Sequence, residues 1–178
     1  MMNRNLLLAV VLSAVVAGCG GKEKTPGTPS AGGSSGAKSG SPAASGPGIK
    51  AKLLVDKTWK VTEVTSDPAV DLNGDGKANT DLIASGEIPE CQLDDTDVYH
   101  SDGTFEADHG ALKCSPQERA KDVGRWSFNA DSTVISTSLG GRESGLHVLE
   151  LTGTTLKESV NISKENRNYT FVVTFVAK

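Results

Sequence analysis

Apolar and polar residues alternate along much of the segment 51–178, and a period of two residues is typical of β-strands. The clearest runs are residues 58–64 and residues 125–128. In the final run, Tyr169, Phe171 and Phe175 share one face, because successive side chains of a strand point to opposite sides. The predicted strands are residues 58–64, 97–100, 104–108, 125–128, 133–138, 146–151, 155–162 and 168–176.

Short turn signals join these strands. Asp102-Gly103, Gly140-Gly141 and Thr152-Gly153-Thr154 are sequences typical of tight hairpin turns. About eight antiparallel strands with short links predict an all-β fold in the form of an up-and-down barrel. A β-sandwich has a similar strand count and is the alternative. Helical turns are expected only in residues 81–86 and 115–121.

The first 18 residues are organised like a cleavable export signal. Arg4 precedes an apolar stretch, residues 6–16, which is too short to span a bilayer comfortably. Residues 16–19, Val-Ala-Gly-Cys, resemble the bacterial lipobox, whose cysteine is lipidated and becomes the new N-terminus. We therefore expect Cys19 to carry acyl chains such as palmitate and to anchor the protein to a membrane. An ordinary signal peptide or a poor transmembrane helix is the alternative.

A segment rich in Gly, Ser, Pro, Ala and Thr follows the cysteine. Residues 20–48 contain no large apolar side chain, so they cannot build a core and are expected to be a disordered tether. A coil of about thirty residues reaches roughly 30 Å. The sequence therefore predicts a signal peptide at 1–18, a lipidated cysteine and tether at 19–50, and one domain of ordinary size at 51–178.

The charge balance is acidic, with a net charge of −4. Removal of the signal peptide takes away Arg4 alone among the charged residues, leaving 17 basic and 22 acidic side chains. This balance argues against nucleic-acid binding and against an electrostatic grip on anionic lipid, so the lipid on Cys19 is the expected membrane contact. Gly20, rather than Asp, follows that cysteine and favours the outer membrane. We expect a monomer.

Export also determines how the other two cysteines are interpreted. Cys91 and Cys114 form an even pair in an oxidising compartment, which favours a disulfide over a metal site. Closing a loop of about twenty residues is worth on the order of 3 kcal/mol in the chain-entropy model. A disulfide between Cys91 and Cys114 is therefore predicted.

Several short motifs follow one another along the predicted domain: residues 57–64, 71–77, 80–82, Cys91, Asp94-Asp95, residues 101–105, Lys113-Cys114 and residues 125–128. Together they resemble the lipocalin-like domain of Bacteroidetes lipoproteins. Trp59 in the first strand also resembles the tryptophan that closes the barrel floor of lipocalins, although Lys57 stands where those proteins usually have a glycine. The resemblance implies a barrel or calyx and does not name a ligand.

Residues 71–77 follow the first half of a calcium-binding loop. Carboxylate and amide oxygens recur at alternate positions, a glycine is sixth, and a backbone carbonyl follows at the seventh. The twelfth position is Leu82, and Asp81 comes one residue early. A surface turn rich in Asp and Asn is the alternative. The predicted ligands of a structural calcium ion are Asp71, Asn73, Asp75, Lys77 and Asp81.

Aromatic residues of the predicted strands are the expected lining of a ligand pocket. A barrel of about eight strands either fills its interior with side chains or holds one small ligand. Aromatic residues make up only 4% of the chain, so a filled core is the alternative. The predicted pocket residues are Trp59, Phe105, Trp126, Phe128, Tyr169 and Phe171.

No catalytic motif accompanies these features. The three histidines lack metal-ligand spacing, and no Gly-x-Ser-x-Gly nucleophile elbow occurs. Asp94, Asp95 and Asp97 are expected in a solvated loop or beside a cation rather than as an acid–base pair. We therefore predict a non-enzymatic cell-envelope lipoprotein whose barrel binds a small apolar or amphipathic ligand. The alternative is a structural or protein-interaction module with a filled core, stabilised by calcium and a disulfide.

Overall fold

The computed structural model describes residues 48–164 and 166–178. The predicted signal peptide, Cys19 and most of the predicted tether lie outside the described residues. The described elements are α2 (Ile49–Leu54), β1 (Thr58–Val70), β2 (Asn79–Asp81), the 3-10 turn η1 (Glu90–Gln92), β3 (Thr96–Tyr99), β4 (Thr104–Asp108), β5 (Lys121–Phe128), β6 (Val134–Leu139), β7 (Arg142–Leu151), β8 (Thr155–Lys164) and β9 (Arg167–Ala177).

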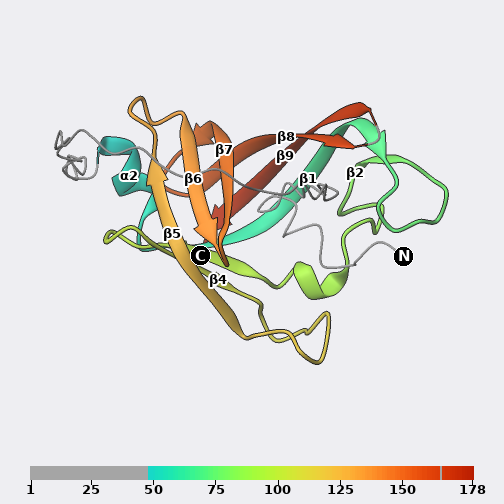
Figure 1. The fold of residues 1–178 in the computed structure, drawn as a ribbon, viewed down its shortest axis with the longest axis horizontal. Helices are drawn as coiled ribbons and strands as arrows, with labels where there is room; N and C mark the ends of the chain where they lie inside the picture. Colours follow the sequence, from blue (N-terminus) through green and yellow to red (C-terminus); the bar gives the residue numbers. More distant parts are fainter. Residues whose placement is uncertain (1–47, 165) are drawn as a thin grey trace, which may run out of the picture. The chain divides into compact units, whose positions relative to one another are not determined.

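Eight of these strands form a closed antiparallel barrel (Figure 1). The strands β3 to β9 pair in sequence order, and β1 pairs with both β3 and β9, which closes the sheet. The short strand β2 pairs only with the far end of β1, outside the ring. The prediction of an all-β, up-and-down barrel is confirmed, and the sandwich alternative is excluded because the sheet has no open edge between β1 and β9.

Every predicted strand is present, and most are longer than predicted. The largest difference is β1, which continues to Val70 instead of ending at Val64. Its pairing with β9 shifts between Val61 and Glu63, so that Val61 and Val64, three residues apart, are both buried. A bulge of this kind breaks the period of two, and the sequence pattern alone does not predict where the strand continues.

The short helix α2 covers one end of the barrel. It begins at Ile49, two residues before the predicted start of the domain, and its Leu54 is fully buried. Trp59 is also fully buried and donates a hydrogen bond of 2.8 Å from its indole nitrogen to the Leu54 carbonyl. Lys57 donates to the Leu53 and Gly153 carbonyls, each at 2.7 Å, and so ties α2 to the β7–β8 turn. Trp59 thus closes this end of the barrel, as the resemblance implied.

The opposite end carries the long connections. The predicted disulfide between Cys91 and Cys114 is present and joins the segment before β3 to the loop between β4 and β5. Of the two segments expected to hold helical turns, residues 81–86 contain one, in which the Ser85 nitrogen donates to the Asp81 carbonyl. Residues 115–121 contain bends, a turn and the start of β5. None of the helices described is long and apolar enough to cross a membrane.

Candidate functional site

The six predicted pocket residues fall into two groups in the barrel. Trp59, Phe105 and Phe171 are buried within the hydrophobic core. Trp126, Phe128 and Tyr169 pack against that core but are only partly buried. The three buried rings therefore fill part of the barrel interior, and part of the surface of the second group remains exposed.

Aromatic contacts connect the two groups. The ring of Tyr99 lies 5.0 Å from that of Phe105 and 5.5 Å from that of Trp126, measured between centroids. Trp126 in turn makes an edge-to-face contact with Phe128 at 5.6 Å. The indole nitrogen of Trp126 donates to the His100 carbonyl at 2.9 Å, which orients the ring. Strands β3, β4 and β5 thus carry a continuous aromatic wall.

A pocket of about 550 Å³ lies on β5, β6 and the start of β7. It is lined by residues 125–127, 136–138 and 143–145, most of which have small or polar side chains. Of the six predicted pocket residues, Trp126 alone lines this pocket.

Polar side chains also face the barrel interior, and sequence reasoning missed them as a group. Asp97 and Tyr99 on β3, Thr137 on β6 and Glu158 on β8 are buried at positions that alternate with more exposed residues. The expectation that Asp97 lies in a solvated loop is therefore wrong. Its register in β3 opposite Trp59 turns its side chain inward. A period of two in residues 96–99 could have predicted that Asp97 and Tyr99 share the buried face of a strand. That prediction is difficult to make from sequence, because it places an acid on a buried face.

Burial changes the protonation of these acids. Desolvation raises the pKa of Asp97 to about 7, and the Asp95 carboxylate adds to the shift. Desolvation raises the pKa of Glu158 to about 8, and the Asp97 carboxylate adds to it. Desolvation and the same two acids, Glu158 and Asp97, also raise the pKa of the Tyr99 hydroxyl. The middle of the barrel therefore disfavours negative charge on the protein itself.

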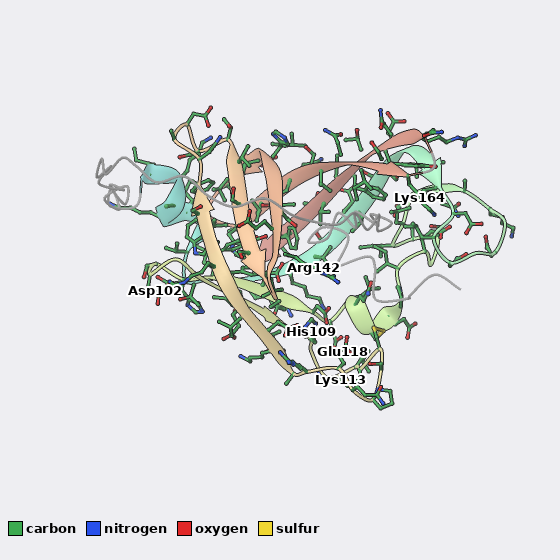
Figure 2. All side chains as sticks on the ribbon, in the orientation of Figure 1. Asp102, His109, Lys113, Glu118, Arg142 and Lys164 are labelled. Carbon is green, nitrogen blue, oxygen red and sulfur yellow. A yellow bond between two sulfur atoms is a disulfide. The ribbon has the colours of Figure 1, made fainter. Side chains whose placement is uncertain are left out.

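An Asp–His–Asp cluster lies at the end of the barrel opposite α2. His109 Nε2 is 3.1 Å from an Asp122 oxygen, and His109 Nδ1 is 3.6 Å from an Asp95 oxygen. Partial burial opposes protonation of His109, but Asp122 and Asp95 outweigh it and raise its pKa. Asp95 itself is 5% exposed, contrary to the expectation of a solvated loop, and desolvation raises its pKa to about 6. Figure 2 shows His109 at the opposite end of β4 from Asp102.

The predicted calcium loop forms a tight turn held by its own side chains. Asp71 accepts hydrogen bonds from the Gly74 and Gly76 backbone nitrogens at 2.6 and 2.8 Å. Asn73 accepts from the Asp75 nitrogen, and Asp75 accepts from the Lys77 nitrogen. Gly74 and Gly76 have φ angles of 81° and 87°, a region that favours glycine.

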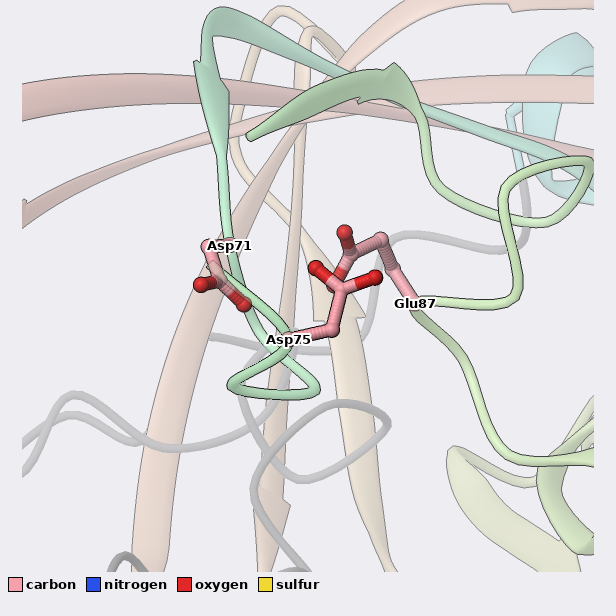
Figure 3. A group of neighbouring side chains, drawn as sticks. All are labelled: Asp71, Asp75 and Glu87. Atoms are coloured by element: carbon pink, nitrogen blue, oxygen red, sulfur yellow. The ribbon is translucent and has the colours of Figure 1, made fainter. Parts of the chain in front are cut away.

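A downstream acid reaches this loop, but it is Glu87 rather than Asp81. Oxygens of Asp71, Asp75 and Glu87 lie within 4.8 Å of one another, and Figure 3 shows the Asp75 and Glu87 carboxylates facing each other. Glu87 is 2% exposed and accepts hydrogen bonds from the Leu72 and Asn73 nitrogens at 2.8 and 2.9 Å. Asp81 instead accepts from the Ala84 nitrogen at 3.0 Å. The three clustered carboxylates can bind a hard cation through oxygen ligands.

Sequence reasoning missed Glu87 because it lies outside any twelve-residue loop pattern. The turn that follows β2 brings it back, since the Glu87 and Ile88 nitrogens both donate to the Leu82 carbonyl. The only sequence signal for this contact is Glu87 itself, the one acid between Leu82 and Pro89.

The sequence matches a known family over most of the barrel. A family model described as a lipocalin-like domain matches residues 55–157, which is more than half of the chain. The match begins just before β1 and ends within β8, so it includes the aromatic wall and the calcium-loop candidate. No curated protein matches the chain. The chain therefore belongs to the lipocalin-like domain family.

Proposed function

We propose that the protein is a cell-envelope lipoprotein whose lipocalin-like barrel binds a small apolar or amphipathic ligand. The observation that carries the binding function is the closed barrel with a partly uncovered aromatic wall, formed by Tyr99, Trp126 and Phe128. Binding sites for small molecules are mostly apolar with a few placed polar groups, and the interior of this barrel has that composition. The lipobox-like residues 16–19 support the envelope location.

Ligand binding is tested by native mass spectrometry of the protein purified from cell envelopes. We expect a co-purifying small molecule that is lost on denaturation, and saturable fluorescence with fatty-acyl or fatty-amine probes. A protein that carries no small molecule and gives no saturable signal with either probe would favour the alternative, a module with a filled core. The full burial of Trp59 and Phe105 is the observation on which that alternative rests.

The membrane anchor is tested separately, through Cys19. Metabolic labelling with palmitate is expected to mark the wild-type chain and to leave Cys19→Ala unlabelled. After fractionation, we expect the labelled protein in the outer membrane, because Gly20 does not match the Asp that retains some lipoproteins at the inner membrane. Equal labelling of both chains would contradict lipidation at this cysteine, whatever the barrel binds.

The loop of residues 71–77 is proposed to bind a structural calcium ion together with Glu87. A cation that binds only the folded state raises its stability by mass action. We expect saturating calcium to raise the thermal midpoint by about 5 °C relative to excess EDTA, a shift that corresponds to roughly 1–2 kcal/mol for a domain of this size.

Two matched substitutions identify the ligands of that ion. Asp75→Asn is expected to abolish the calcium-dependent shift, because it removes one of the three clustered charges. Asp81→Asn is expected to keep the shift, because that carboxylate faces Ala84. An unchanged midpoint of the wild-type chain in EDTA would remove the calcium site from the proposal.

A further inference from the structure

The carboxyl group of Glu158 is buried without a partner. Its side chain is 1% exposed, and neither carboxyl oxygen has a hydrogen-bond partner among the described residues. A buried polar group that lacks a hydrogen bond is costly, and most native proteins avoid it. Because Glu158 faces the interior of a binding barrel, a bound ligand could supply the missing hydrogen-bond partner.

The polar atoms around Glu158 come from distant strands. Around the barrel, β1 and β9 separate β3 from β8, so that inward-facing side chains of β3 and β8 approach one another across the interior. Asp97 on β3 is close enough for its carboxylate to raise the pKa of Glu158. Thr137 on β6 is 2% exposed, and its hydroxyl also lacks a hydrogen-bond partner among the described residues. Strands β3 and β8 therefore present carboxyl groups to one interior region, and Thr137 on β6 lies opposite Trp126 of the aromatic wall.

All the buried charged side chains of the described residues are acids. The buried charged side chains among residues 48–164 and 166–178 are Glu87, Asp95, Asp97 and Glu158, with no buried lysine or arginine. Lys57, near the barrel floor, donates to two backbone carbonyls instead. A group that complements paired carboxylates is a cation with several N–H donors, since charge-assisted hydrogen bonds are the strong ones.

The aromatic wall supplies the second half of a ligand site. Tyr99 follows Asp97 on the inward face of β3 and contacts the ring of Trp126. An alkyl chain next to such a wall is removed from water, and a cation near the rings gains a further attraction. The Asp95–His109–Asp122 cluster lies on the same side of β3 as Asp97, toward the end of the barrel opposite α2. Its two aspartates place further acidic groups at that end of the barrel.

We propose that the barrel interior binds the ammonium group of a small amphipathic amine between the carboxyl groups of Asp97 and Glu158, with the alkyl part against Trp126 and Phe128. This inference rests on the proposed ligand-binding function and specifies the chemical class of the ligand. It is an interior site, distinct from the calcium-loop candidate, and it shares Trp126 with the pocket on β5, β6 and β7.

Binding of such an amine is coupled to proton release. Burial keeps much of Glu158 protonated at neutral pH, and this carboxyl group must give its proton to solvent when the ammonium group enters. The titratable groups that face it are Asp97 and Tyr99, whereas its cross-strand neighbours Val148 and Val173 are uncharged. Affinity for an alkylamine is therefore expected to rise with pH from about 6 to about 8, by up to about tenfold per unit for one released proton.

The test compares octylamine, octanol and octanoate by isothermal titration of the purified, disulfide-bonded full chain. These probes share a chain length and differ in the head group. At pH 8 we expect octylamine to bind at least about tenfold more tightly than octanol, and octanoate to bind most weakly. Octanol or octanoate that bound as tightly as octylamine would overturn the amine site and leave ligand binding standing. Failure of all three probes to bind would overturn both proposals.

Substitutions assign the head-group site. Glu158→Gln is expected to reduce octylamine affinity about tenfold and to leave octanol affinity unchanged, and Asp97→Asn is expected to act in the same direction. Retained octanol binding shows that each variant is folded. The control is Glu150→Gln, an exposed acid of neighbouring β7, which is expected to change neither affinity. Equal octylamine affinity in wild type, Glu158→Gln and Asp97→Asn would overturn the assignment.

Discussion

Replacement of Glu158 by Gln is expected to raise the free energy of unfolding at pH 8 by roughly 3–5 kcal/mol. Burial raises the pKa of this carboxyl group from 4.5 to about 8, so the folded state holds the proton more tightly than the unfolded state. The contribution of this group to stability is therefore fully present below about pH 4.5 and is lost as the pH rises toward 8. The amide of glutamine stays neutral, so the variant escapes this loss.

The free energy of unfolding of the wild-type chain is expected to depend on pH for the same reason. We expect its free energy of unfolding to fall by up to about 1.4 kcal/mol per pH unit for Glu158, with a further fall from Asp97 between about pH 4 and 7. Urea unfolding at a series of pH values measures both effects. Glu150→Gln serves as the control, because this acid is exposed. A wild-type stability that does not change between pH 5 and 8 would contradict burial of the two acids.

Replacement of Trp59 by Ala is expected to lower the free energy of unfolding by about 3–5 kcal/mol. The indole is fully buried, and its loss leaves a cavity where α2 meets the barrel. The substitution also leaves the Leu54 carbonyl without its donor. Urea unfolding followed by circular dichroism, with the disulfide intact, measures the change.

Two variants separate the contributions of Trp59. Trp59→Phe keeps an aromatic ring but removes the hydrogen bond to Leu54, so we expect a loss intermediate between wild type and Trp59→Ala. Trp126→Ala is the matched control, because this tryptophan also donates to a backbone carbonyl but is only partly buried. A smaller loss is expected there. Equal losses for Trp59→Ala and Trp126→Ala would argue that Trp59 does not close the barrel floor.

The strand pattern was readable from sequence because one face of each strand is buried. Tyr169, Phe171, Val173 and Phe175 share one face of β9, which buries three of these four side chains. The bulge near Thr62 in β1 was not readable, since a bulge depends on how two strands coil around each other. The short helix α2 was also missed, because residues 49–54 form a single turn and a half that is stabilised by packing on Trp59.

The candidate sites divide in the same way. Local sequence was enough to predict the turn of residues 71–77, since Asp71, Asn73 and Asp75 bond to backbone nitrogens a few residues ahead. The acid that completes it, Glu87, is sixteen positions after Asp71 and arrives only through the fold. The disulfide was predictable from the predicted export signal and from the two cysteines that remain besides Cys19, and the structure confirms the pairing.

By itself, the sequence of this protein determined the strands, their antiparallel order, the disulfide and the family resemblance, because these follow from local periodicity, turn chemistry and composition. Only the tertiary structure decided that the sheet closes between β1 and β9, and that Asp97 and Glu158 share an interior. The physical reason is that closure and burial are set by contacts between residues far apart in the chain. The same carboxyl group is an ordinary acid on an exposed strand face and an unpartnered, protonated one inside a barrel.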